Sequence, residues 1–157
     1  MNEFEKVEKR IVEWNKERGN TEFSLDLEMR LLLEEAQEYF VADNLIDKFD
    51  AFLDYLFVGQ GSLWKYEIND INNEEFSEFV SHTGAVLWED FERQLQKELF
   101  PINHFFNFVN DGLEIVLRYN NKKSAMKDAN GKIVKPVNWS GPEKELEELF
   151  KEYMNKK

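Results

Sequence analysis

Two groups of carboxylates lie on successive segments with helical periodicity. In chain order they are Glu34-Glu35-x-x-Glu38 and Asp47-x-x-Asp50-x-x-x-Asp54. On a helix, residues four apart are separated by about 40° around the axis, so each group shares one side of its helix. Like charges at that spacing destabilise a helix by about 0.2–0.5 kcal/mol per pair. Two such groups on neighbouring helices require a counter-charge, and Mg²⁺, for which Mn²⁺ could substitute, prefers carboxylate oxygens.

A basic segment near the C-terminal end contrasts with the rest of the chain. Between residues 118 and 135 there are six basic residues and a single acid, Asp128, whereas the whole chain carries a net charge of −12. The basic residues are Arg118, Lys122, Lys123, Lys127, Lys132 and Lys135. Lysine ammonium groups and the amide of Asn120 suit phosphate oxygens. Lys127 is better explained as a solubilising group. Carboxylates for a metal and cations for an anion together predict a site for a metal-bound polyphosphate.

Composition narrows the class of protein. The 157 residues, of which 42% are hydrophobic, suffice for one domain spanning residues 1–157. The acidic balance disfavours nucleic acid and anionic membranes as partners. The absence of cysteine excludes disulfides, thiolate catalysis and zinc–sulfur sites. With no apolar signal or membrane-length run, the expectation is a soluble cytoplasmic protein.

Apolar periodicity predicts an all-α fold. Helices are expected over residues 3–18, 25–42, 45–58 and 101–118, with a last helix opened by Gly141-Pro142-Glu143. Gly59-Gln60-Gly61 is expected to end the third helix, and residues 68–73 to form a loop. Residues 74–80 and 85–99 are expected to form two short helices. The short connection near Asp43 should make the second and third helices antiparallel neighbours, with their carboxylates face to face.

The order of these motifs resembles the all-α nucleoside triphosphate pyrophosphatases, a superfamily that includes MazG-like proteins, dimeric dUTPases and phosphoribosyl-ATP pyrophosphohydrolase. Glu35-x-x-Glu38 matches the Glu-x-x-Glu motif of its first helix. The second motif departs, because Ala51 stands three residues before Asp54 and the acid is Asp50 instead. In that respect the chain is similar to a subset of phage and bacterial MazG-like members. Residues 118–142 are similar to the substrate loop of the same subset, and the intervening residues 64–99 match poorly.

The resemblance implies a MazG-like helical bundle with a long C-terminal substrate loop and Mg²⁺-dependent cleavage between the α and β phosphates of a nucleotide. It implies Glu35, Glu38 and Asp54 as metal ligands with Asp50 next, and Glu34 as the base for the attacking water or as a further ligand. Asn120 and Lys123 would hold the nucleotide, assisted by Lys132 and Lys135. The family also implies a homodimer or a dimer of dimers.

Other interpretations remain open from the sequence. A Glu-rich helical segment is most often a solvated face, and Asp47 could be only a carboxylate stabilised by a helix N-terminus. Trp139 could stack on a base or anchor the basic segment. Among functions, a dUTPase-like nucleotide hydrolase is the nearest alternative. A DNA mimic or a plain helical interaction module would be the non-enzymatic alternatives.

Overall fold

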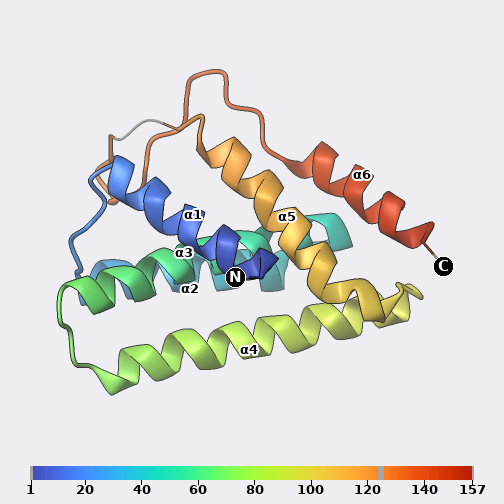
Figure 1. Ribbon diagram of the computed structural model, residues 1–157, viewed down its shortest axis with the longest axis horizontal. Coiled ribbons are helices and arrows are strands. Elements are labelled where there is room, and N and C mark those ends of the chain that lie inside the picture. Colours follow the sequence, from blue (N-terminus) through green and yellow to red (C-terminus); the bar gives the residue numbers. More distant parts are fainter. Residues whose placement is uncertain (1, 124–125, 157) are drawn as a thin grey trace.

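The computed structural model describes residues 2–123 and 126–156, and that part of the chain is helical throughout apart from its connections (Figure 1). Its only β-type pairing is an isolated bridge between Lys127 and Ile133. The elements are α1 (Glu3–Glu17), α2 (Leu25–Val41), α3 (Leu45–Ile68), α4 (Glu74–Lys97), the 3₁₀ helix η1 (Ile102–His104), α5 (Phe105–Asn120) and α6 (Glu143–Met154). The predicted all-α fold is confirmed.

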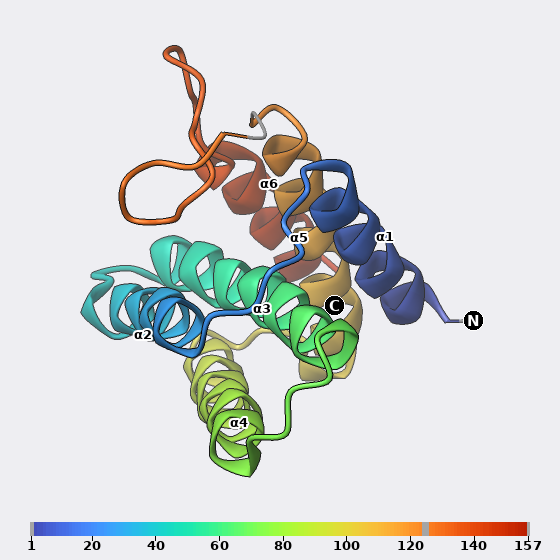
Figure 2. The same ribbon diagram turned by 90° about the vertical axis from the view of Figure 1, so that its left-hand side faces the viewer.

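Helix α3 forms the centre of the bundle and packs against α1, α2, α4, α5 and α6 (Figure 2). Its sequence explains this position, because it carries buried side chains on nearly every side. Phe49 stacks between Phe91 of α4 and Phe108 of α5, with ring centroids 5.4 and 4.2 Å away. Gly112 lets α5 approach closely, since a Cβ atom there would lie 2.6 Å from the Phe49 ring. This aromatic core fixes α3 relative to the helices around it.

The α2–α3 hairpin forms as predicted. Asn44 caps α3 by accepting the Asp47 backbone N–H at 2.8 Å, and its own amide donates to the Asp47 carboxylate. Since only residues 42–44 separate the two helices, the chain must reverse, and α2 and α3 form the most extensive helix pair. Asp47 is therefore a capping partner at the start of α3.

The predicted end of the third helix at residues 59–61 is wrong, because α3 continues to Ile68. Both glycines are buried inside the helix. Gly61 faces Asn15 of α1 so closely that a Cβ atom would lie 2.9 Å from the Asn15 amide nitrogen. Here glycine gives space for a neighbouring helix, and burial of α3 outweighs the low helix propensity of glycine.

Residues 74–80 and 85–99 do not form two helices. They belong to the single helix α4, which Asn73 caps by accepting the Phe76 backbone N–H at 3.1 Å. Its polar middle section does not interrupt it, because Val80 and Leu87 remain buried on either side of that section. Along the part of the chain that is described, none of the helices is long and apolar enough to cross a membrane.

Candidate functional site

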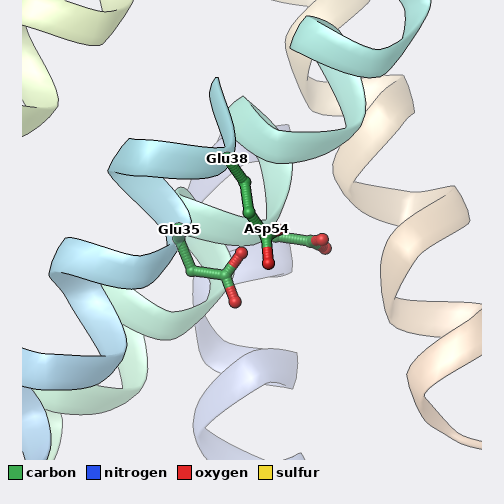
Figure 3. A group of neighbouring side chains, drawn as sticks. All are labelled: Glu35, Glu38 and Asp54. Atoms are coloured by element: carbon green, nitrogen blue, oxygen red, sulfur yellow. The ribbon is translucent and has the colours of Figure 1, made fainter. Parts of the chain in front are cut away.

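Three carboxylates from α2 and α3 meet at one point between the two helices (Figure 3). Glu35 and Glu38 reach from α2 toward Asp54 on α3, and one oxygen of each lies within 4.8 Å of the others. The hairpin brings them together because Glu35 and Glu38 occupy adjacent positions on the face of α2 that packs against α3. The predicted convergence of the two acidic segments is confirmed for these three residues.

Burial and mutual repulsion disfavour the charged forms of Glu35 and Asp54. Glu35 is only 8% exposed, and its Oε2 atom is buried without a hydrogen-bond partner among the described residues. Burial and the neighbouring Glu38 raise the pKa of Glu35 to about 8. Burial, followed by the charges of Asp50 and Glu35, also raises the pKa of Asp54 well above its ordinary value. A cluster of three carboxylates with an unpaired buried oxygen fits a hard divalent cation such as Mg²⁺.

Asp50 lies outside this group of three. Burial and the charge of Glu143, at the start of α6, raise the pKa of Asp50 to about 7. Its Oδ1 atom is buried without a hydrogen-bond partner among the residues described. Asp50, Glu143 and Asp54 line a small cleft of their own. Asp50 therefore borders the three-carboxylate group without sharing its oxygen cluster.

Glu34 is held by the basic segment. The Lys132 ammonium group donates a hydrogen bond of 2.5 Å to Glu34 Oε1 and lies 4.0 Å from Glu35. Burial disfavours the charged form of Lys132, but the hydrogen bond to Glu34 and the nearby acids outweigh it and raise its pKa. The basic segment, far away in sequence, thus reaches the predicted acidic site.

The other predicted substrate-binding residues line a pocket that also contains the three carboxylates. Asn120, Lys123 and Lys135 line it together with Asp54. Burial lowers the pKa of Lys123, an effect that Asp54 partly opposes. The ammonium groups of Lys123 and Lys135 lie 5.3 and 5.7 Å from the centre of the Trp139 ring. Trp139 therefore lies within cation–π distance of both lysines.

Hydrogen bonds to the backbone fix the turn at residues 128–132 of the basic segment. The Asp128 carboxylate accepts the backbone N–H groups of Asn130 at 2.8 Å and Lys132 at 3.1 Å. Gly131 has φ +84°, and Arg30 of α2 donates to the Asn130 carbonyl at 2.8 Å. This turn places Lys132 over α2, whereas Lys127 is exposed beside it and contributes nothing to the pocket.

The pocket extends well beyond the predicted residues. It encloses about 190 Å³ and continues between α2 and α3, away from the carboxylates, toward Glu28 and Lys65. Asn15 and Asn20, from α1 and the turn after it, form another wall. No short motif marks these residues in the sequence. The sequence indicates them only through their helical phase, because Glu28 lies two turns before Glu35 and Lys65 lies three turns after Asp54.

No protein-family model matches the chain, and no curated protein or solved structure matches it either.

Proposed function

We propose that the protein is a Mg²⁺-dependent nucleoside triphosphate pyrophosphohydrolase that cleaves between the α and β phosphates and releases a nucleoside monophosphate and pyrophosphate. One observation carries the proposal: Glu35, Glu38 and Asp54 converge to within 4.8 Å directly beside the lysines of the basic segment. Carboxylates alone would suit many cations, and lysines alone would suit many anions. Their juxtaposition suits a polyphosphate that arrives with its metal.

In this proposal Glu35, Glu38 and Asp54 hold the metal, with Asp50, which lies in the adjoining cleft, as the candidate for a further ligand. The bound Mg²⁺ would polarise the phosphoryl oxygens and lower the pKa of a bound water. Lys123 and Lys135, supported by Trp139, would hold the phosphates and stabilise the charge that develops on them. Asn120 would hold the nucleotide, since it lines the same pocket as the carboxylates.

Glu34 would accept the proton of the attacking water. It precedes Glu35 in the sequence and both carboxylates contact Lys132, but Glu34 is not among the residues that line the pocket, so its side chain would have to turn toward the attacking water. The hydrogen bond from Lys132 orients its carboxylate. Lys132 would contact both Glu34 and the phosphates, so the position of the base would depend on that of the substrate.

The test is a panel of natural and modified ribo- and deoxyribonucleoside triphosphates with Mg²⁺, with pyrophosphate and orthophosphate measured separately. We expect pyrophosphate from one or a few nucleotides, none in EDTA, and none from Glu38→Gln or Asp54→Asn at unchanged helical circular dichroism. Orthophosphate from the terminal position would show that the reacting bond is a different one. Cleavage of a nucleoside diphosphate between its α and β phosphates cannot release pyrophosphate. Hydrolysis of dUDP to dUMP would therefore indicate a dUTPase-like enzyme instead.

Full activity of both variants, or in EDTA, would refute the mechanism. Glu147→Gln is a suitable control, because Glu147 is an exposed carboxylate of α6 whose ion pair within the described residues is with Lys151. It should behave as the unaltered protein does in every arm of the experiment.

A further inference from the structure

The pocket between α2 and α3 is a groove lined by one face of each helix. On α2 the lining positions follow a helical spacing, and on α3 they do the same in the opposite direction. They are Glu28, Leu31, Glu35 and Glu38 on α2, and Asp54, Val58, Gly61 and Lys65 on α3. The three-carboxylate group thus occupies one end of the groove and the pair of Glu28 and Lys65 the other.

The two ends are separated by a distance that suits a nucleotide. Eleven residues of α3 span about 16 Å between the Cα atoms of Asp54 and Lys65. Side chains on a helix lean toward its N-terminus, so both residues shift the same way, and the longer side chain of Lys65 shifts further and reduces the gap. A ligand with its phosphates at the carboxylates would direct its base toward Lys65.

The middle of the groove is apolar. Leu27 and Leu31 of α2 face Phe57 and Val58 of α3, and Ile133 of the basic segment lies over them. These apolar walls suit the two faces of an aromatic ring. The groove therefore presents metal ligands, then an apolar slot, then one buried charged pair.

Glu28 and Lys65 form a hydrogen-bonded network with Ser62, and Lys65 is its most exposed member. Glu28 is fully buried and accepts hydrogen bonds from Ser62 Oγ at 2.6 Å and from Lys65 Nζ at 2.9 Å. Ser62 is 1% exposed and Lys65 is 4% exposed, so Lys65 has the most accessible surface of the three. An ammonium group has three N–H donors, and Glu28 is the only residue that accepts from it in the described part of the chain.

A buried ion pair seldom adds stability over an apolar pair of the same volume. Its presence in the wall of a ligand pocket therefore points to recognition. Because Glu28 is fully buried whereas Lys65 keeps some accessible surface, the pair offers the ligand a hydrogen-bond donor and no accessible acceptor. The N–H groups of Lys65 would donate to a carbonyl oxygen of the ligand. They would repel an amino group, which presents N–H donors as well.

We propose that Lys65, positioned by Glu28 and Ser62, selects nucleobases that carry a keto oxygen on the edge opposite the sugar. These bases are uracil, thymine, guanine and hypoxanthine, and the disfavoured ones are cytosine and adenine. The inference rests on the proposed function, because it needs the phosphates to bind at the carboxylates. It assigns Lys65 as the specificity-determining residue and Glu28 as a positioning residue.

Two pairs of nucleoside monophosphates test this selectivity without any turnover. Inosine and adenosine monophosphate differ in a keto against an amino group on the purine edge, and dUMP and dCMP differ likewise on the pyrimidine edge. Titration calorimetry of the full chain with Mg²⁺ should show about tenfold or tighter binding of the keto member in at least one pair, as expected for a charged hydrogen bond. Equal binding within both pairs, or no binding of any nucleotide, would overturn the proposal.

Variants then assign the effect to Lys65. Lys65→Met leaves Glu28 buried without its partner, so the double variant Glu28→Gln/Lys65→Met provides a neutral pair that keeps the Ser62 contact. The keto preference should fall to about twofold or less in every variant that retains helical circular dichroism, while Mg²⁺ binding persists. Lys48→Met is the matched control, since Lys48 also lies on α3 but donates to the Tyr39 carbonyl outside the groove.

A preference that survives in the folded double variant would overturn the assignment. Keto-selective binding without release of pyrophosphate from any triphosphate would instead overturn the proposed reaction and leave the selectivity in place. Release of pyrophosphate with no keto preference would overturn the selectivity and leave the proposed reaction in place.

Discussion

Replacing Glu35 by glutamine should stabilise the metal-free protein, and more so as the pH rises. The pKa of Glu35 is raised from 4.5 to about 8, chiefly because its carboxyl group is buried. Between these values the folded state binds a proton that the unfolded state has lost, so stability falls as pH increases. Each pH unit removes at most about 1.4 kcal/mol, so that crossing the window costs the unaltered protein about 3 to 5 kcal/mol. Glu35→Gln keeps the shape of the side chain and removes this cost.

Urea unfolding in EDTA, followed from about pH 4.5 to about pH 8.5, measures the difference. The two proteins should be nearly equal in stability at the acidic limit, and the variant should be more stable by the stated amount at the basic limit. Mg²⁺ at about a hundredfold its Kd should return about 2.7 kcal/mol to the unaltered protein and clearly less to the variant. A difference that does not vary with pH, or equal stabilisation of both proteins by Mg²⁺, would refute the reasoning. Glu147→Gln should follow the unaltered protein throughout.

Further expectations concern the basic segment, α6 and assembly. Gly131→Ala should weaken nucleotide binding at unchanged helical circular dichroism, because φ is +84° and the new Cβ would lie 2.7 Å from Leu27 Cδ1. Lys123→Met should lower kcat/KM by about a hundredfold, since its charge lies beside Asp54 where the phosphates would bind; a loss under threefold would contradict this role. Hydrogen bonds from Arg118 and Tyr119 lower the pKa of Glu145 to about 2. The stability that Glu145 gives should therefore be present above pH 4.5 and be lost as the pH falls toward 2, which acid unfolding of Glu145→Gln against the unaltered protein would show. Sedimentation at micromolar concentration should show a homodimer or a dimer of dimers, and a monomer would contradict the assembly.

The parts of the fold that were predicted correctly are those that local chemistry decides. The α2–α3 hairpin follows from apolar periodicity on both sides of residues 42–44 and from the cap that Asn44 provides. The end of α3 was mispredicted because glycine usually signals a break. At Gly61 glycine is required instead by a contact with Asn15, nearly fifty residues earlier, whose side chain occupies the space that a Cβ atom would need. Such a contact leaves no trace in the local pattern.

The candidate site divides in the same way. Glu35, Glu38 and Asp54 were identifiable because like charges beside an apolar stripe are unusual and therefore conspicuous. Glu28 and Lys65 were not, since each is a single charged residue in a chain of which a third is charged. Their pairing depends on the register of α2 against α3, which periodicity alone does not supply. Only the relative phase of the two helices places them in one groove with the carboxylates.

The placement of charge also bears on the non-enzymatic alternatives. A DNA mimic must display its carboxylates on an open surface, where they can replace phosphates. Here Glu35 is buried, and Lys132 of the basic segment covers Glu34. The pKa of Glu35 near 8 means that, without a cation, its carboxyl group is largely protonated at neutral pH and presents little negative charge. A surface built to imitate nucleic acid would gain nothing from acids that neutralise themselves, whereas a metal site requires that its ligands be desolvated and close together.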